Sequence, residues 1–403
     1  MGVRDKKYIP LILSLYVNYI FQGIGAIIIA QNLNVFTERW SATTSQVTLV
    51  ISALGVGRII SLNYAGYFSD KYGRQKAIYV GVISYLIYFL GLLIAPNYIV
   101  GFILTLFAGI GNSFLDTGTY PAVSDGYPED NDSSSLSVLN KAFISTGQFI
   151  LPLITHYILE HNYYFGWMFI VSAVCLMVNT TLVAKMKFPP MRKIAKKDNG
   201  VSESNILIPK SKIHIEGISL LIFSFISVSL FNIFIIWVPT FAAQTIHFGK
   251  TQSLMFVSIY SISSFISVFI TSMLVKRGIN IPLFIAFCTL VTGLAIGCAV
   301  VSPSLTTIVI MSLVVGFFSA GGIWQLGVSL LLEFFPTHKG KFTGFYSFST
   351  AISLMLTPYF TGLIAEKSIN AVFLYNMFLG VLGTVLLTIV AVRYKKIIKP
   401  LKN

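Results

Sequence analysis

Twelve long apolar runs, separated by short polar segments, follow one another along almost the whole chain. A helix needs roughly 20 mostly apolar residues to cross the hydrocarbon core of a bilayer. We therefore predict an all-α membrane protein of twelve transmembrane helices. Their expected ranges are 9–31, 44–69, 77–95, 98–124, 137–159, 164–186, 213–238, 250–275, 280–301, 304–332, 342–364 and 369–394.

A polar, lysine-rich segment, residues 187–212, divides the predicted helices into two sets of six. The segment Asp125–Pro128, an acid followed by an aromatic residue and proline, ends the fourth helix, and Glu333–Pro336 repeats this order after the tenth. Such an echo is typical of transporters built from two parallel repeats, whose substrate site lies between the repeats near the membrane midplane. We predict six-helix bundles at 1–186 and 213–403, joined by this linker.

Charged residues make up only 10% of the 403 residues, whereas 55% are hydrophobic. A soluble domain carries about 25% charged residues, so most of this surface faces lipid. With the N-terminus inside, 24 of the 28 lysines and arginines, Lys141 among them, lie on the cytoplasmic side, and only Arg39, Lys250 and Lys367 lie outside. This distribution predicts a multi-pass plasma-membrane protein with both termini cytoplasmic. It also accounts for the net charge of +14 without a nucleic-acid partner.

The most specific motif is Gly66–Lys76, GYFSDKYGRQK, between the second and third predicted helices. It resembles the signature loop of the major facilitator superfamily, which runs glycine, any residue, small apolar, small, aspartate, basic, any residue, glycine, arginine, basic. The resemblance implies two six-helix bundles around a central cavity that opens alternately to the two sides of the membrane. It says nothing about the solute.

The resemblance also implies that this motif forms a conformational gate. Asp70 would contact the N-terminal end of helix 342–364 and hold the bundles together on the cytoplasmic side. A helix N-terminus favours an anion by ~0.3–1 kcal/mol. Gly66 would allow close helix packing, and Gly73 a tight turn that other residues resist. Arg74 is the arginine of the pattern. The alternative interpretation is a loop whose charges only reflect the preference of basic residues for the cytoplasmic side.

Arg58 and Asp116 are ionisable residues deep inside apolar runs, where a charge is costly and marks a functional candidate. At 1.5 Å per residue, Arg58 lies roughly 16 Å and Asp116 roughly 13 Å from the expected cytoplasmic helix ends. Similar depth permits an ion pair, which lowers the cost of burying both charges. The pair could serve proton coupling or substrate contact, or it could be a permanent structural link.

Asn112, Asp116 and Tyr120 are spaced four residues apart and share one face of a helix. The segment Leu115–Pro121 is similar to the fourth helix of the fucose and related sugar–proton symporters. That resemblance implies that Asp116 takes part in substrate binding and proton coupling. The second acidic residue of that group has no match in helix 9–31, so the proton argument depends on Asp116.

Several polar or aromatic residues of the first, seventh and tenth helices are further candidates for the substrate cavity, because amides and indoles suit sugars or other neutral polar solutes. Each could equally form a helix–helix hydrogen bond or an interfacial anchor. They are Asn18, Gln22, Gln31, Asn232, Trp237, Trp324 and Gln325.

Motifs for other chemistry are absent from the sequence. It contains no GxxxxGK[ST] phosphate loop, no HExxH and no GxSxG, and its three cysteines lack metal-ligand spacing. We therefore expect no cofactor, no metal and no enzymatic activity. We predict a monomeric secondary transporter in which protons drive a small polar solute, sugar-like or an organic acid. The alternatives are drug or metabolite efflux by proton antiport and a non-transporting membrane sensor.

Overall fold

The computed structural model describes residues 6–126, 130–190, 211–321, 323–336 and 339–398. Most of the predicted linker 187–212 lies outside the described residues. The first half of the chain forms α1 (Ile9–Gln31), α2 (Leu33–Arg39), α3 (Thr44–Tyr72), α4 (Arg74–Ile94), α5 (Tyr98–Gly126), α6 (Asp130–Glu160) and α7 (Trp167–Ala184). The second half forms α8 (Ile218–Thr245), α9 (Met255–Lys276), α10 (Ile281–Val301), α11 (Leu305–Val314), α12 (Ile323–Phe334), α13 (Lys339–Ala365) and α14 (Ile369–Ile397).

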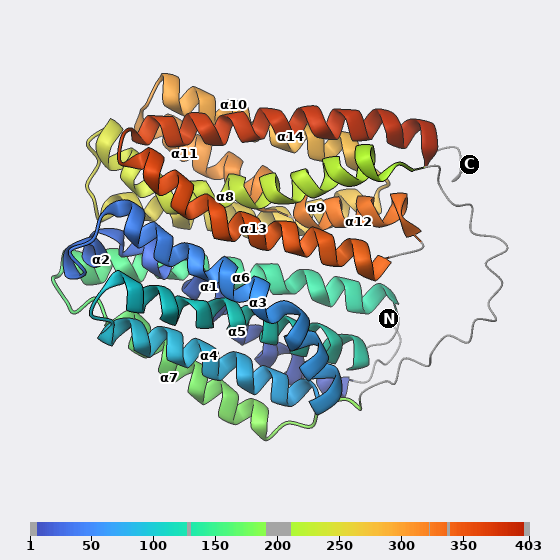
Figure 1. Cartoon of the computed structure of the whole chain (residues 1–403), viewed down its shortest axis with the longest axis horizontal. Coiled ribbons are helices and arrows are strands. Elements are labelled where there is room, and N and C mark those ends of the chain that lie inside the picture. Colours follow the sequence, from blue (N-terminus) through green and yellow to red (C-terminus); the bar gives the residue numbers. More distant parts are fainter. Residues whose placement is uncertain (1–5, 127–129, 191–210, 322, 337–338, 399–403) are drawn as a thin grey trace.

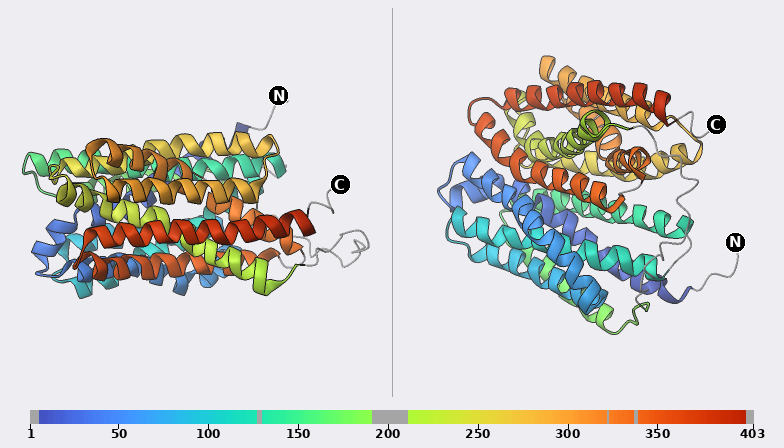
Figure 2. Two further views of the ribbon diagram at one scale, coloured as in Figure 1. Left: turned by 90° about the horizontal axis from the view of Figure 1, so that it is seen from above. Right: turned by 45° about the vertical axis from the view of Figure 1, so that its right-hand side comes forward.

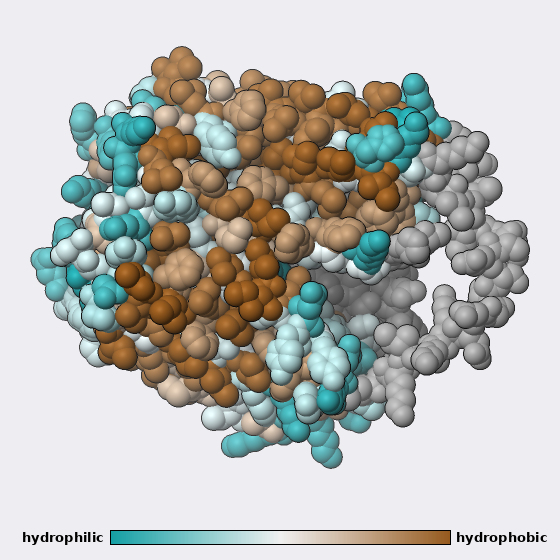
Figure 3. Space-filling model, in the orientation of Figure 1, coloured by the Kyte–Doolittle hydropathy of each residue, from teal (hydrophilic) through white to brown (hydrophobic). Residues whose placement is uncertain are grey.

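Twelve helical spans in the described residues are long and apolar enough to cross a membrane. The predicted all-α architecture of twelve transmembrane helices is confirmed. The surface agrees with it, because hydrophobic residues cover the middle of the molecule and hydrophilic residues gather toward its ends (Figure 3). Such an apolar belt suits contact with lipid chains.

The helix boundaries differ from the predicted ranges at two places that matter for the site. Helix α6 begins at Asp130 instead of residue 137, so its polar first turns extend the helix at one end. The predicted helix 304–332 is divided into α11, a π-helical segment at Val315–Ala320, and α12. A π-helical segment interrupts the regular hydrogen-bond ladder and often marks a functional region.

The helices gather into two groups, which we call the N-half (α1–α7) and the C-half (α8–α14) (Figure 1). Both chain termini lie at the same end of the molecule (Figures 1 and 2). We call this the terminal end and the opposite one the distal end. Helix α3 begins at the distal end with a capping box formed by Thr43 and Gln46.

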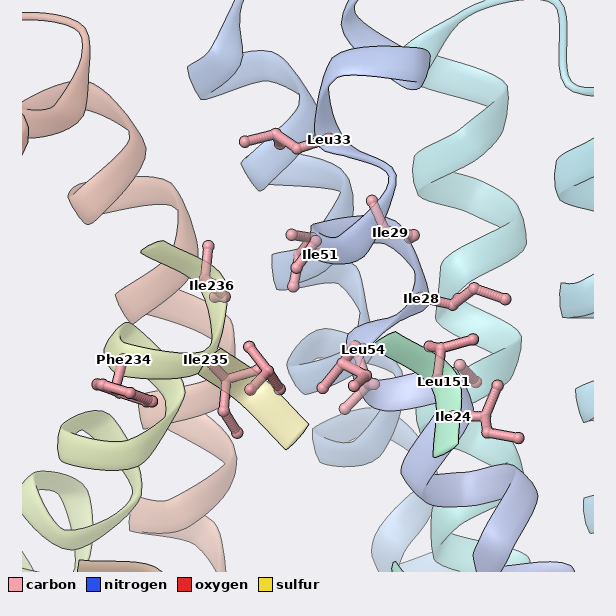
Figure 4. Packing of buried hydrophobic residues seen from close by; sticks show 14 of the residues in the cluster. Ile24, Ile28, Ile29, Leu33, Ile51, Leu54, Leu151, Phe234, Ile235 and Ile236 are labelled. Carbon is pink, nitrogen blue, oxygen red and sulfur yellow. The ribbon is translucent and has the colours of Figure 1, made fainter. Parts of the chain in front are cut away.

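One hydrophobic cluster crosses from one half to the other. It joins Ile51 and Leu54 of α3 to Phe234, Ile235 and Ile236 of α8. Figure 4 shows the side chains of Ile235 and Leu54 extending into the space between these two helices. The halves therefore pack directly against each other through apolar side chains, with the polar groups described below placed around that contact.

Candidate functional site

The ion pair expected from helix depth is present in the interior of the N-half. The guanidinium of Arg58 on α3 lies 3.0 Å from the carboxylate of Asp116 on α5. Their side chains are 19% and 16% exposed. The hydroxyl of Tyr19 on α1 donates a hydrogen bond to the other carboxylate oxygen at 3.1 Å. Three helices thus converge on one carboxylate, and the sequence had indicated two of them.

Close packing of α3 against α5 positions the pair. A Cβ added at Gly109 of α5 would lie 2.1 Å from the carbonyl oxygen of Leu54 and 2.6 Å from the amide nitrogen of Arg58. Only glycine allows the two backbones to approach this closely. Asp116 lies seven residues beyond Gly109 on α5. Its carboxylate faces Arg58, the α3 residue whose backbone lies close to Gly109.

The polar face of α5 meets a different helix at each of its three predicted residues. Asn112 accepts a hydrogen bond from the Tyr85 hydroxyl of α4, and Tyr120 accepts one from the Asn140 amide of α6. The ring of Tyr120 is 39% exposed although Tyr19 of α1 and Asn140 lie beside it.

The other predicted cavity residues divide into two groups. Asn18 accepts a hydrogen bond from Asn179 of α7, and the indole of Trp324 donates one to Thr350 of α13 at 2.8 Å. The remaining three are not hydrogen-bonded through their polar side-chain atoms in the part of the chain that the structure describes. These are Gln22, which is buried, Asn232, which is half-buried, and Gln325, which is exposed.

The predicted gate motif lies at the terminal end, in the connection between α3 and α4. Gly73 has φ +104°, so the expected tight turn is present. Arg74 contacts Asp70, Ser69 and, at 3.6 Å, Asp125 of α5. The Asp70 side chain is 73% exposed and is paired with Arg74. The structure shows no bond between Asp70 and the described residues of α13.

Close helix packing at Gly66 is not seen in this conformation. A Cβ added there would meet no atom within 4 Å among the described residues. The close packing expected at Gly66 therefore stays a prediction for another conformation.

The model of the Major Facilitator Superfamily matches residues 11–293 and 282–402, which together span nearly the whole chain. The chain belongs to the major facilitator superfamily. It is 30% identical over 395 residues to the inner membrane transport protein YdiM of Escherichia coli K12, covering 97% of this chain and 96% of that protein. It is 31% identical over 392 residues to the MFS-type transporter YfkL of Bacillus subtilis 168, covering 95% and 96%.

A solved major facilitator structure, a D-xylose–proton symporter, superposes with a TM-score of 0.75 at 14% identity, covering 94% of this chain and 97% of that one. At 14% sequence identity, this structural similarity establishes the fold alone. Family and fold together identify a multi-pass membrane transporter, and the expectation that the protein is not an enzyme is confirmed.

In this major facilitator chain the halves are bonded at the distal end and in the middle. Glu366, just after α13, accepts a hydrogen bond from the Ser45 amide in the first turn of α3 at 3.0 Å. The Tyr359 amide of α13 donates to Ser52 of α3 at 3.2 Å. The further bonds between the halves in the described residues join α6 to α9 at Ser145–Ser264 and Phe149–Ser258. No hydrogen bond or ion pair joins described residues of the two halves nearer the terminal end.

We expect Glu366→Gln to weaken closure of the distal end. The side chain and backbone N–H of Ser45 donate hydrogen bonds to Glu366 and hold the pKa of its carboxyl below the ordinary value. The contact therefore stabilises distal closure fully above the ordinary carboxyl pKa. This stabilisation is lost as pH falls through the lowered pKa of Glu366. Spin labels at exposed positions Asn97 and Asn370, with the native cysteines replaced, would report the distal distance.

The wild type should show a longer distal distance on acidification, and Glu366→Gln should show that longer distance already at neutral pH. Glu38→Gln, which alters another exposed acid at the same end, should behave as the wild type. A distance distribution that responds to neither pH nor the Glu366 change would contradict a role of this contact in distal closure.

Proposed function

We propose that this transporter is a proton-coupled carrier that moves a small polar solute by alternating access, with Asp116 as the proton site. The observation that carries the proposal is the Arg58–Asp116 pair at 3.0 Å inside a transmembrane bundle, with both side chains partly accessible. A carboxylate in such a place can take up and release a proton. An arginine beside it provides a partner that is bound in one protonation state and released in the other.

The proposed coupling step uses three residues already in contact. With Asp116 ionised, Arg58 and the Tyr19 hydroxyl hold the carboxylate between α1, α3 and α5. Protonation removes the charge that attracts Arg58, so the three helices lose a shared contact. Because α3 also carries the distal contact with α13 through Ser45 and Ser52, a shift of α3 would alter the closure between the halves.

Orientation follows from the basic residues, and we propose that the terminal end is cytoplasmic. The conformation would then be inward-facing, because the bonds between the halves lie at the distal end and in the middle. Asp70 would meet the start of α13 only in the opposite state. We retain Gly66, Asp70, Gly73 and Arg74 as the proposed gate of that state, and a monomer of two bundles, 1–186 and 213–403, as the working unit.

The proposal is tested with the purified protein in sealed vesicles that contain a pH-sensitive dye. A panel of neutral sugars and small organic acids is added outside at constant ionic strength. Inward movement of the transported solute should acidify the lumen, and an imposed proton gradient should drive its accumulation. Transport of a solute that neither moves protons nor responds to the gradient would refute proton coupling.

A further inference from the structure

Lys141 occupies a position that the sequence analysis did not identify. It was counted on the cytoplasmic side near the start of the predicted helix 137–159, and it is the second residue of the apolar span Asn140–Glu160. Helix α6 begins at Asp130, eleven residues earlier, so Lys141 is roughly 16 Å along the helix. The side chain is half-buried, and its ammonium group lies 5.1 Å from the ring centroid of Phe231 in the middle of α8.

This contact places a positive charge between the two halves. Lys141 belongs to the N-half and Phe231 to the C-half, so the ammonium group lies at the interface between the halves, and two-repeat transporters bind their solutes between the repeats. A cation over an aromatic face is attracted to it, but this attraction offsets only part of the cost of removing an ammonium group from water. The contact alone leaves the charge without a counter-ion.

The neighbouring charges of the interior are already neutralised. Arg58 is paired with Asp116, and the buried Glu216 with Arg393. Lys141 has no acidic partner in the residues that the structure describes. The described interior therefore carries one uncompensated positive charge, and that charge can attract an anion.

Asn140, the residue before Lys141 in α6, connects this position to a hydroxyl with an unused proton. The Asn140 amide is committed to the Tyr120 hydroxyl, and the residue is 2% exposed. The Tyr120 hydroxyl accepts the Asn140 amide, so its own proton remains available to a ligand oxygen. On the other half, Asn232 follows Phe231 in α8. A carboxylate oxygen accepts hydrogen bonds from such hydroxyl and amide donors.

Four of the groups that would suit a neutral sugar are occupied, whereas the Asn18 amide nitrogen and the Gln22 side-chain oxygen have no partner among the described residues. The oxygens of Asn18 and Asn112 accept hydrogen bonds from Asn179 and Tyr85. The indoles of Trp237 and Trp324 donate to Thr361 and Thr350, both at 2.8 Å. These side chains hold helices together, whereas the cation of Lys141 has no comparable partner.

We propose that Lys141 is the anion-binding residue of the central site and that the transported solute is a small carboxylate. The carboxylate would lie between Lys141 with Tyr120 on the N-half and the Phe231–Asn232 segment on the C-half. The inference rests on the proposed transport function and narrows its solute class. One bound anion would neutralise the interior and contact both halves at once.

The test measures binding, which does not require transport. Purified protein in detergent is titrated into the millimolar range with sodium acetate, lactate, succinate and benzoate, with the corresponding neutral amides, with xylose and with phosphate. The unfolding temperature is followed, because a ligand that binds the native state raises it. At least one carboxylate should stabilise the wild type while its amide does not, and phosphate should act weakly.

Three variants test whether the binding depends on Lys141. Lys141→Gln should weaken the apparent Kd of the effective carboxylate about tenfold or more, and Lys141→Arg should retain much of the binding. Lys396→Gln makes the same charge change at an exposed position of α14 and should bind as the wild type does.

Failure of the inference can be told from failure of the transport proposal. If no carboxylate stabilises the wild type, or if Lys141→Gln binds it unchanged, the role of Lys141 is overturned. Stabilisation by xylose with none by carboxylates would assign a neutral solute instead. If carboxylate binding depends on Lys141 but the vesicles show no proton movement, the anion site stands and the coupling proposal fails.

Discussion

Asp116→Asn is expected to abolish accumulation of the solute against its gradient while solute exchange across the membrane continues. Asparagine keeps the size and a hydrogen-bond acceptor for Tyr19, but it can neither ionise nor carry a proton. Accumulation driven by an imposed proton gradient should therefore fall at least about tenfold, to the level of simple equilibration. The measurement is uptake of a transported solute from the panel into vesicles, with and without the pH gradient.

Two further variants separate this outcome from misfolding. Asp116→Asn leaves Arg58 without its partner, and breaking a buried pair can cost about 3–5 kcal/mol, less here because both side chains are partly exposed. The double variant Arg58→Gln, Asp116→Asn removes the unpaired charge and should recover thermal stability but not accumulation. Glu38→Gln, at an exposed acid, should leave both unchanged. Accumulation by Asp116→Asn at the wild-type level would exclude Asp116 as the proton site.

The sequence predicted this pair because both residues could be placed along their helices by counting residues. A constant helical rise converts sequence position into depth, and two charges of opposite sign at equal depth are expected to meet. The rotation of each helix cannot be counted in the same way. Tyr19, which completes the contact with Asp116, therefore remained one aromatic residue among many in helix α1.

Lys141 was misplaced for a related reason. The polar residues before it suggested that the helix begins at 137, which would put Lys141 in the first turn, whereas α6 begins at Asp130 and Lys141 is eleven residues along it. The acidic and serine-rich first turns of a helix look like a connecting segment when only hydropathy is considered.

The predicted cavity amides could not be ranked from the sequence for a different reason. Asn18 and Asn232 have the same side-chain chemistry, and only the fold shows that Asn18 is hydrogen-bonded to Asn179.

The interface between the halves was hardest to foresee. An acid bound to a helix N-terminus was expected at Asp70 on the terminal end. The structure instead has Glu366 at the first turn of α3 on the distal end. The expected contact and the observed one would use the same interaction of a carboxylate with free backbone N–H groups. In alternating access the two contacts would form in opposite states, so a single conformation can show only one of them.

Gly55→Ala is expected to stop transport while leaving the two halves folded. A Cβ at Gly55 of α3 would lie 2.3 Å from the amide nitrogen of Met355 and 2.7 Å from the carbonyl carbon of Leu354 on α13. These are backbone atoms, so the helices must separate where the halves now touch. The distal distance between labels at Asn97 and Asn370 should increase, and uptake should fall about tenfold or more because distal closure is impeded.

Two other glycine-to-alanine substitutions serve as controls for Gly55→Ala. Gly57→Ala would bring a Cβ to 2.1 Å from the Leu106 carbonyl oxygen inside the N-half, so it should impair folding itself. At Gly293 the nearest atom to an added Cβ is 3.5 Å away, and Gly293→Ala should transport normally. If Gly55→Ala kept both the wild-type distance and the wild-type uptake, the α3–α13 contact would not belong to the transport cycle. A longer distance with normal stability would instead establish that the halves close against each other along this line.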